Sequence, residues 1–318
     1  ISVPLSYFLA IGRASRDGIL IKGGKELEQL RTIKTAIFDK TGTITEGVFA
    51  VQKIVSPTMS QEKLLEIAAY GEYYSNHPIS QSVLKKYGKK IDSETLFEEK
   101  GILLDVPPEI GTTIYVAENR VYIGHLVIAD KIKESSYSIV ESLAAVGVDN
   151  VVMLSGDDER VVESVAKQLH IPSYYGKLLP EEKVEKVKHW KKEGCAGFVG
   201  DGINDVPVIQ VADIGIALGG IGSDATIEAS DVVFMKDDVS KLSTAILLSQ
   251  YTHRLVLINI WFAIGAKVLV LFLSLLGLGT IWLAVLADVG VTLLCVLHTL
   301  SILKRKSFCK MYPLSRTK

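Results

Sequence analysis

The sequence predicts an α/β protein built on a doubly wound parallel sheet, with a smaller inserted α+β domain and transmembrane helices. Apolar strands alternate with helices between residues 127 and 248, which is the rhythm of a parallel sheet. Residues 47–126 interrupt this pattern with strand and helix signals of their own. Near the C-terminus, residues 255–276 and 281–303 form two apolar segments, each long enough for the ~30 Å hydrocarbon core of a bilayer.

Composition restricts the possible classes of protein. The 318 residues suffice for two or three domains, and 48% of them are hydrophobic, with a mean hydropathy of +0.30, so we expect part of the chain in lipid. The net charge of −1 gives no basic field, and nucleic acid is not expected as a partner. Cys195, Cys295 and Cys309 lie far apart, which favours reduced cytosolic thiols over disulfides.

The first residues predict the end of a truncated transmembrane helix. Residues 1–12 are apolar but shorter than the roughly 20 residues that a span requires. Arg13, Arg16, Lys22 and Lys25 follow, and this basic cluster places the helix exit on the cytoplasmic side. An amphipathic surface helix is the alternative.

The central motif of the chain is AIFDKTGTIT, which delivers an aspartate onto a polar loop. Thr35–Phe38 is predicted to be a buried strand, with Asp39 at the carboxyl edge where open α/β sheets place their chemistry. A carboxylate there can attack a phosphoryl group if nearby donors and a cation neutralise the developing charge. Lys40, Thr41 and Thr43 supply such donors. The alternative is that Asp39 only caps the following turn.

The motif DKTGTIT resembles the phosphorylation loop of the P-type ATPases, ion pumps whose phosphorylation domain is a haloacid dehalogenase-like fold. Further motifs follow in the family's order and at about its spacing, so the resemblance covers essentially the whole chain. They are SNHP (75–78), LSGD (154–157), LPEEK (179–183) and GDGINDVP (200–207). The resemblance implies an enzyme that uses ATP and Mg²⁺ and forms an aspartyl phosphate on Asp39.

The resemblance also implies which residues surround Asp39. The expected catalytic residues are Asp39, Lys40, Thr41, Ser155, Gly156, Asp157, Lys183, Asn204 and Asp205. Mg²⁺ prefers carboxylates, waters and substrate phosphate, and we expect Asp39, Thr41 and Asp201 to hold it. Taken alone, Lys183 is typical of a solvated helix, and the acidic turn around Asp201 is typical of a protein surface.

Residues 47–126 are expected to be the nucleotide-binding domain, with two helices on a small sheet. The helices are predicted at 61–74 and 80–87, and the strands at 102–106, 112–117 and 120–123. His77, beside Pro78, is the candidate adenine contact, with Glu72 nearby and Gly124 later in the domain. Relatives carry Gly-x-Gly and Gly-Asn here, whereas this chain has PPEIG at 107–111 and His125 after Gly124.

Ionisable residues interrupt both predicted spans. Lys267 lies near the middle of the first and Asp288 in the second, where charges are costly and usually functional. The alternative for this charged pair is a salt bridge that only holds two helices together. The alternative for the two spans is that they are buried helices of a soluble protein. Basic residues at 253–254 and 304–306 place both ends of the pair in the cytoplasm. In the zinc, cadmium and lead-exporting branch of the heavy-metal P-type ATPases, this pattern implies that Asp288 contacts the metal and Lys267 balances its charge.

We therefore expect the C-terminal part of an ATP-driven exporter of Zn²⁺, Cd²⁺ or Pb²⁺. The Cys-Pro-Cys helix and the actuator domain are expected in the N-terminal part of the same pump, which would be a partner of this chain, as would membrane lipid. Its location would be the cell membrane, multi-pass, with the catalytic domains in the cytoplasm. The expected domains are the end of a truncated transmembrane helix (1–12), a phosphorylation domain (13–46 and 127–250), a nucleotide-binding domain (47–126), two transmembrane helices (255–303) and a cytosolic basic tail (304–318).

Three alternatives come from other readings of the same residues. One is a membrane-tethered phosphatase of the dehalogenase-like superfamily, although such enzymes usually carry a second Asp two residues after the nucleophile, where this chain has Thr41. Another is a P-type ATPase with different cargo, such as Cu⁺. The third is a binding module without chemistry, which the presence of Asp39, Lys183, Asp201 and Asp205 argues against.

Overall fold

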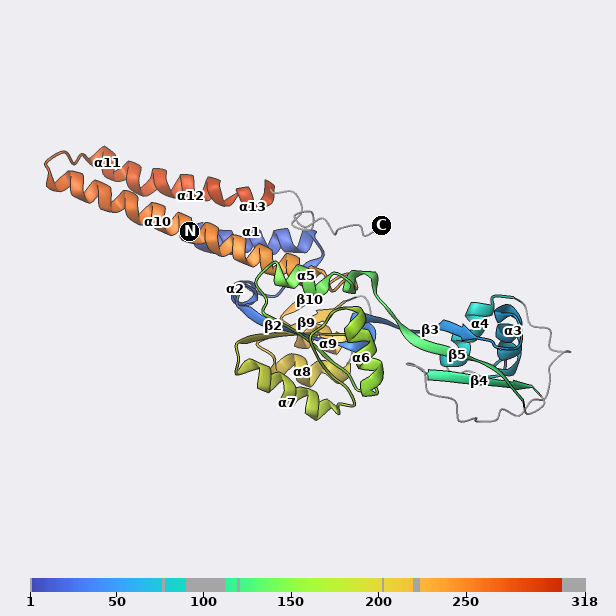
Figure 1. The fold of residues 1–318 in the computed structure, drawn as a ribbon. Helices are drawn as coiled ribbons and strands as arrows, with labels where there is room; N and C mark the ends of the chain where they lie inside the picture. Colours follow the sequence, from blue (N-terminus) through green and yellow to red (C-terminus); the bar gives the residue numbers. More distant parts are fainter. Residues whose placement is uncertain are drawn as a thin grey trace.

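The computed structural model describes residues 2–75, 78–89, 112–118, 121–201, 203–219 and 224–304. Its parts follow one another along one direction (Figure 1). A domain with a seven-stranded sheet lies in the middle, a smaller inserted domain lies at the end of a two-stranded ribbon, and a long helical hairpin extends on the opposite side.

The large sheet is parallel except at one edge. Strand β1 pairs antiparallel with β10, and every other pair in this sheet is parallel. The strands in spatial order are β1 (Ile19–Ile21), β10 (Val232–Phe234), β9 (Ile214–Leu218), β8 (Cys195–Gly200), β2 (Ile33–Asp39), β6 (Asn150–Leu154) and β7 (Ser173–Tyr175). The predicted α/β fold with a parallel sheet is confirmed, with β1 as the exception.

Strand β2 is the centre of this sheet. Ala36 and Phe38 enter the hydrophobic core on one face and Ile37 enters the core on the other, as the period-two alternation of a strand requires. The next strands in the chain, β6 and β7, lie on one side of β2, whereas β8 lies on its other side. The strand order therefore reverses beside β2, and Asp39 ends β2 at the carboxyl edge where open sheets bind ligands.

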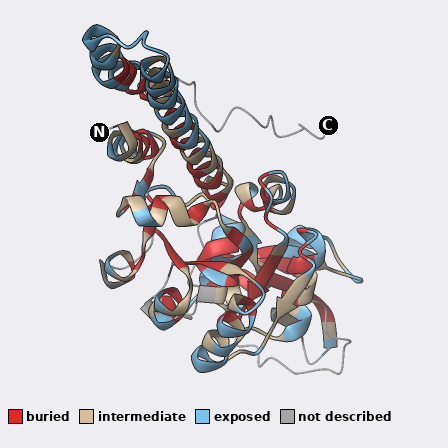
Figure 2. Cartoon of the chain, turned by 90° about the vertical axis from the view of Figure 1, so that its left-hand side faces the viewer, coloured by how far each residue is buried: buried red, intermediate tan, exposed pale blue. Residues whose placement is uncertain are grey.

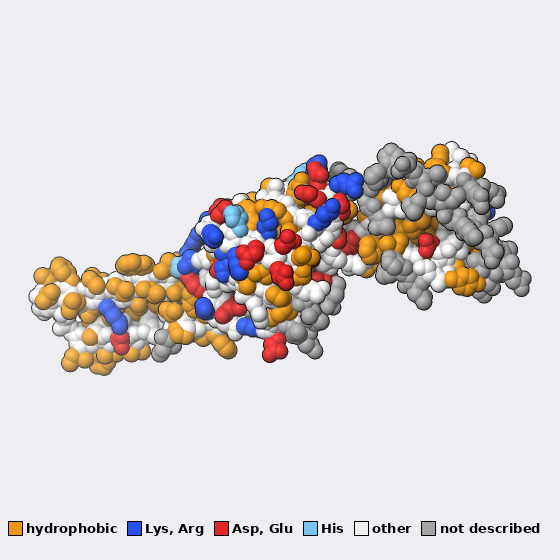
Figure 3. All heavy atoms as spheres, turned by 90° about the horizontal axis from the view of Figure 1, so that it is seen from below, with side chains coloured by type: hydrophobic (Ala, Val, Ile, Leu, Met, Phe, Trp, Pro, Cys, Tyr) orange, Lys and Arg blue, Asp and Glu red, His pale blue; other side chains and the backbone are white. Residues whose placement is uncertain are grey.

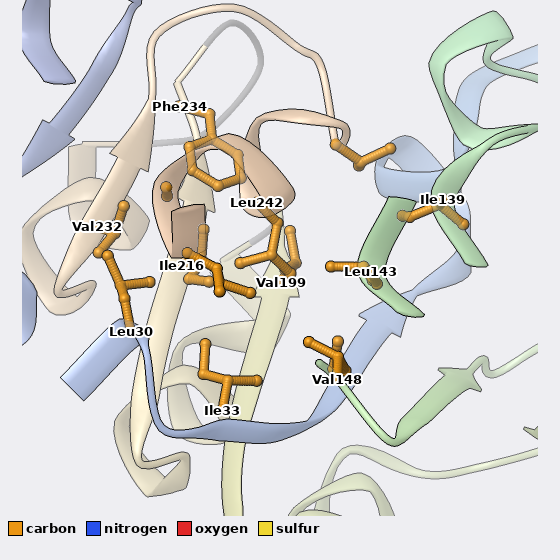
Figure 4. Close-up of a cluster of buried hydrophobic side chains, with 14 of the residues drawn as sticks. Leu30, Ile33, Ile139, Leu143, Val148, Val199, Ile216, Val232, Phe234 and Leu242 are labelled. Atoms are coloured by element: carbon orange, nitrogen blue, oxygen red, sulfur yellow. The ribbon is translucent and has the colours of Figure 1, made fainter. Parts of the chain in front are cut away.

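Helices cover both faces of the sheet. They are α2 (Gly24–Leu30), α5 (Ile139–Ala144), α6 (Glu159–Gln168), α7 (Pro180–Lys191), α8 (Val206–Val211) and α9 (Asp224–Ala229), and the 3₁₀ turns are η3 (Glu134–Ser136) and η4 (Ile203–Asp205). Figure 4 shows part of the larger core, where Leu143 of α5 and Leu242 lie with Val199 and Ile216 of the sheet. The smaller core packs α7 and α8 on the other face. Helix α8 ends at Val211, and strand β9 begins at Ile214.

The inserted domain is a three-stranded antiparallel sheet with two helices. Its elements are β3 (Thr45–Val55), α3 (Gln61–Gly71), α4 (Pro78–Tyr87), β4 (Thr112–Glu118) and β5 (Val121–Ile132), with strand order β3-β5-β4. The apolar faces of both helices pack on this sheet around Leu64 and Leu126. The expected strand at 102–106 lies outside the described residues. The first helix ends at Gly71 because the sequence to Ser75 forms a turn, not at the predicted residue 74.

Strand β3 was not predicted, and β5 is longer than predicted. Both strands cross the expected domain boundaries at 46/47 and 126/127, and they pair with each other from Thr45 opposite Ile132 to Val55 opposite His125. Figure 1 shows this ribbon as the connection between the two domains, and we refer to β3 and β5 together as the hinge ribbon. Any movement of the inserted domain must therefore pass through β3 and β5.

The helical hairpin follows directly on the last strand of the sheet domain, and the N-terminal helix packs against it. Its elements are α1 (Ser2–Arg16), α10 (Lys241–Leu275), α11 (Ile281–Val285), a π-turn (Leu286–Gly290), α12 (Val291–Thr299) and α13 (Ser301–Lys304). The 35-residue α10 is about 52 Å long at ~1.5 Å per residue. The expected span at 255–276 is thus the outer part of a longer helix, and α1 continues beyond residue 12 to include Arg13 and Arg16.

The outer part of the hairpin exposes apolar side chains. Segments Lys241–Leu275 and Ile281–Leu303 are long and apolar enough to cross a membrane. The buried residues of α10 all lie between Leu242 and Asn259, and Figure 2 shows the far end of the hairpin exposed. Figure 3 shows hydrophobic side chains covering this end, with a basic and an acidic side chain together among them.

Polar contacts join the hairpin to the domain below it. Glu28 of α2 accepts hydrogen bonds from Tyr7 of α1 at 2.6 Å and from Arg31 at 2.7 Å, and its Oε1 lies 2.8 Å from Nδ1 of His253 in α10. Burial raises the pKa of Glu28, but the hydrogen bonds from Tyr7 and Arg31 outweigh it and hold this pKa below its usual value. Glu28 thereby connects α1, α2 and α10.

Candidate active site at the end of strand β2

Asp39 is a buried carboxylate held by a lysine. The residue is 6% exposed, and Nζ of Lys183 lies 2.5 Å from its Oδ1. The same Nζ lies 3.1 Å from Oδ1 of Asp205. One ammonium therefore bridges two carboxylates that are distant in the sequence. Asp39 ends β2, and Asp205 lies in the turn after β8.

The start of α7 explains how Lys183 reaches this position. The helix begins at Pro180, whose fixed backbone suits the first helical turn, and Glu182 accepts a hydrogen bond from the backbone N–H of Leu179 at 2.8 Å. Lys183 therefore lies in the first turn of α7, three residues after the first residue of the helix. Burial lowers the pKa of Lys183, but Asp39 and Asp205 outweigh burial and raise it, so the side chain is a fixed cation.

Three carboxylates converge at this edge of the sheet. Asp39, Asp201 and Asp205 each offer an oxygen, and these oxygens lie within 4.8 Å of one another. Burial and the neighbouring Asp205 raise the pKa of Asp39 to about 7 and that of Asp201 to about 6. Excess negative charge in a buried place is relieved by a divalent cation, and an all-oxygen carboxylate set suits Mg²⁺. The residues present therefore fit the cation that the motifs imply.

The Lys40–Ile44 loop is compact and specific in its backbone. Gly42 has φ = +75°, and a Cβ added there would lie 1.9 Å from Oδ2 of Asp201, so only glycine allows this close approach. Lys40 is 3% exposed and forms an ion pair with Asp157, whereas Thr41 is exposed at the edge of the site. The buried hydroxyl of Thr43 has no hydrogen-bond partner in the part of the chain that the structure describes.

The LSGD motif lies at the end of the neighbouring strand β6. Buried Ser155 accepts a hydrogen bond from the backbone N–H of Asp157 at 3.1 Å, while Gly156 is exposed. Asn204 is exposed in the η4 turn. A cavity of about 350 Å³ opens beside the loop, and its lining includes Lys40 and Asp157. The structure thus gathers the predicted residues of the sheet domain around one edge of the sheet, and the cavity lies beside Lys40, Thr41 and Asp157.

The structure describes only some of the residues that were predicted to contact the nucleotide. Glu72 accepts a hydrogen bond from Ser80, His77 lies outside the described residues, and Pro78 begins α4. Gly124 lies where β5 passes α3, and a Cβ there would come within 2.5 Å of both a Leu64 methyl carbon and the Val55 carbonyl oxygen. The structure therefore gives Gly124 a packing reason to be glycine, and nucleotide contact by this residue stays a prediction.

Sequence reasoning missed Lys133, at the end of the hinge strand β5. It is 5% exposed, and its Nζ donates to the carbonyl of Gly42 and to Oδ1 of Asp237, the latter at 2.5 Å. The charged stretch around it is typical of a surface, so no pattern in the sequence indicated burial. The contact depends on the register of β3 and β5, which brings the end of β5 beside the Lys40–Ile44 loop.

The two charged residues of the helical hairpin meet. Nζ of Lys267 in α10 lies 3.0 Å from Oδ1 of Asp288, which lies within the π-turn. Both side chains are more than half exposed, at 62% and 70%, on the surface of an otherwise apolar hairpin. Turns of this type within helices are frequent at functional sites. This pair and the acidic cluster lie in different parts of the molecule.

Comparisons with known proteins agree with this geometry. A family model described as haloacid dehalogenase-like hydrolase matches residues 33–213. The chain is 42% identical over 96% of its length to the cadmium, zinc and cobalt-transporting ATPase of Bacillus subtilis (strain 168), and 42% identical over 96% to the zinc-transporting ATPase of Synechocystis sp.. It covers 48% and 46% of these proteins, so it spans about half the length of the curated relatives it matches.

A solved structure shows the same similarity in three dimensions. The crystal structure of a zinc-transporting PIB-type ATPase in the E2.Pi state superposes with a TM-score of 0.83 at 32% identity, over 95% of this chain and 55% of that one. Identity and superposition both extend over almost all of the chain, including the inserted domain and the hairpin. The chain therefore belongs to the haloacid dehalogenase-like hydrolase family, and over almost all of its length it is similar to cadmium- and zinc-transporting ATPases.

Proposed function

We propose that this chain is the catalytic and C-terminal membrane part of an ATP-driven exporter of divalent heavy-metal ions. The observation that carries the proposal is the cluster of Asp39, Lys183, Asp201 and Asp205 at the switch point of the sheet, in which Asp39 and Asp205 are buried and Asp201 is half-buried. The catalytic domains face the cytoplasm, and the two apolar helices of the hairpin cross the membrane. The N-terminal part of the pump would be its partner.

The transfer step begins at Asp39. One oxygen of its carboxylate attacks the γ-phosphorus of ATP, the new O–P bond forms, and the bond from that phosphorus to the β,γ-bridging oxygen breaks, so ADP leaves with the electron pair. Asp39 must be ionised to attack, and Lys183 at 2.5 Å favours the ionised form against the cost of burial. Asp205 holds Lys183 in place from its other side.

Asp39, Asp201 and a Thr41 oxygen would hold Mg²⁺. When bound, Mg²⁺ neutralises charge that develops on the phosphoryl oxygens. Gly42 lets the loop approach Asp201 closely, so that the loop that follows Asp39 packs against this second carboxylate. The pair between Lys40 and Asp157 anchors the loop to the end of β6, and Ser155 fixes the turn that carries Asp157.

The ion pair of Lys267 and Asp288 supports the choice of cargo. A divalent ion in a membrane needs an anionic ligand, and Asp288 is an acidic side chain within an apolar hairpin. Lys267 can neutralise that carboxylate once the ion has left. The relatives transport zinc, cadmium or cobalt according to their names, and we assign this chain to the same class of cargo.

The catalytic proposal is tested by labelling the 318-residue chain with ATP carrying a labelled γ-phosphate. We expect an acid-stable label that hydroxylamine removes, that requires Mg²⁺, and that is absent from Asp39→Asn. The Asp201→Asn variant should keep its fold and lose most of the label. Equal labelling of Asp39→Asn would refute the assignment of the nucleophile. Asp149→Asn, which changes an exposed carboxylate beside Lys34, is the matched control and should label normally.

A further inference from the structure

The buried Lys133 has no role in the transfer step described above, yet it contacts the Lys40–Ile44 loop that directly follows Asp39. Its side chain is 6% exposed, and among the described residues its Nζ donates to the Gly42 carbonyl and to Oδ1 of Asp237. Burying an ammonium is costly unless it is paired and hydrogen-bonded. The position of this cation is therefore tightly defined by the two groups that it binds.

Strand β5 holds the catalytic loop through several contacts around Lys133. The backbone N–H of Lys133 donates to the carbonyl of Ile44 at 3.1 Å, and the Ser136 hydroxyl donates to the same carbonyl at 2.8 Å. Thr45, at the end of the loop, donates to Asp130 of β5 and contacts the Lys40 carbonyl at 2.9 Å. The end of β5 and the residues that follow it thus hold the C-terminal end of the loop at Ile44 and Thr45.

Asp237 connects this junction to the membrane helix. It lies in the short segment between β10 and α10, where Asp238 accepts hydrogen bonds from the backbone N–H of Ser240 at 3.0 Å and from its hydroxyl at 2.6 Å. These bonds fix the segment to the first turn of α10, the helix that carries Lys267. Lys133, which directly follows β5, therefore contacts both the catalytic loop and the segment that leads into α10.

We propose that Lys133 is a positioning residue for phosphoryl transfer, which binds the Gly42 carbonyl so that Gly42 stays beside Asp201, and which links the catalytic loop to the segment before α10 through Asp237. This inference rests on the proposed function. Without the ammonium, the Gly42 carbonyl loses a charge-assisted hydrogen bond and the loop can move away from Asp201. Because hydrogen bonds to charged groups are the stronger ones, the arrangement of Asp39 and Asp201 depends on this contact.

The change in Mg²⁺ affinity of Lys133→Met distinguishes a positioning role of Lys133 from a purely electrostatic role. Lys133 is a cation near Asp201 and lowers its pKa against the effect of burial, so a charge-only role predicts that Lys133→Met binds Mg²⁺ more tightly. Positioning predicts the opposite, because a displaced loop no longer presents Asp201 and the Thr41 oxygen together. We expect at least tenfold slower labelling and a severalfold higher Mg²⁺ concentration for half-maximal labelling.

The experiment measures labelling of the full chain in detergent from Mg-ATP over a range of Mg²⁺ concentrations. Lys131→Met is the matched control, because Lys131 lies on the same strand but is exposed and pairs with Glu46 at 2.7 Å. It should behave as the unchanged chain does. The Lys133→Arg variant keeps the charge and should recover part of the rate. The thermal unfolding midpoint of each variant is measured alongside, because a positioning role predicts slow labelling in a folded protein.

A double-mutant cycle tests the link to α10. If Lys133 acts through Asp237, adding Asp237→Asn to Lys133→Met should slow labelling no further than Lys133→Met alone, whereas Asp237→Asn by itself should slow it at least threefold. Should Lys133→Met fail to fold, the single Asp237→Asn variant decides the question. Normal kinetics in folded Lys133→Met, tighter Mg²⁺ dependence, or normal kinetics in Asp237→Asn would overturn the inference. Absence of Asp39-dependent label in the unchanged chain would instead overturn the proposed function.

Discussion

Replacing Asp39 by Asn should stabilise the protein above neutral pH in the absence of Mg²⁺. Burial and the nearby Asp205 raise the pKa of Asp39 from 3.8 to about 7, despite Lys183. The folded state therefore binds this proton more tightly than the unfolded state does, and the resulting stability is present at low pH and lost as the pH rises toward 7. The Asn side chain does not titrate in this range, so the free energy of unfolding of the variant does not fall in this way as the pH rises.

The size of the effect follows from the shift. Each pKa unit corresponds to ~1.4 kcal/mol, so a shift of about 3 units is worth on the order of 4 kcal/mol, of which about 2.5 kcal/mol is lost between pH 5 and pH 8. For a domain of this size, that is roughly 5 to 10 °C in the unfolding midpoint. Asp39→Asn should gain this much relative to the unchanged chain over that interval.

Thermal unfolding of the full chain in detergent with a chelator, between pH 5 and pH 8, measures this gain. Asp149→Asn should show no pH-dependent gain, since this carboxylate is exposed. Mg²⁺ should reduce the difference at pH 8 by stabilising the unchanged chain more than Asp39→Asn. A difference in midpoint that stays constant or shrinks as the pH rises would show that Asp39 is not a destabilised carboxylate.

Three other predictions concern the loop, the helix junction and the hairpin. Gly42→Ala should abolish labelling, because its Cβ would collide with the neighbouring carboxylate, whereas Gly47→Ala has similar backbone strain at φ = +66° but no close contact and should still label; equal labelling of both would contradict this account. Glu28→Gln should lower the unfolding midpoint at pH 7. Since the folded pKa of Glu28 is depressed below 4.5, this loss should disappear as the pH falls through that depressed pKa; a loss that persists at lower pH would point to packing. In the whole pump, Asp288→Ala should remove the stimulation of ATP hydrolysis by Zn²⁺ or Cd²⁺, and Lys267→Ala should leave the carboxylate unpaired and slow turnover; undiminished stimulation of Asp288→Ala would refute the cargo assignment.

Local patterns were sufficient for the parallel sheet and its catalytic edge. An apolar run followed by Asp39 predicts a strand end, and strands that run parallel must bring their loops to one edge, so the meeting of Asp39 with Asp201 and Asp205 follows from topology. The pairing of Lys183 with Asp39 needed the motif resemblance as well, because nothing in a Lys/Glu-rich helix distinguishes one lysine from the next.

The hinge ribbon and the hairpin were harder to predict, for physical reasons. Strand β3 has mixed polarity because most of it is exposed on one side, so its pattern is weak, and β5 owes its length to pairing with β3. Lys133 is buried by contacts from Gly42 and Asp237, which are distant in sequence. The full extent of α10 was hidden because its base is buried against the sheet domain, whereas hydropathy marks only the apolar part.

The central claim is that Asp39 itself becomes phosphorylated. The most direct measurement is to phosphorylate the full chain with Mg-ATP, reduce the acyl phosphate with borohydride, and locate the modified residue by peptide mass spectrometry. The account predicts homoserine at position 39, only in samples that received both ATP and Mg²⁺. Unmodified Asp39 in a chain that carries label on a serine, threonine or histidine, or on another carboxylate, would contradict it.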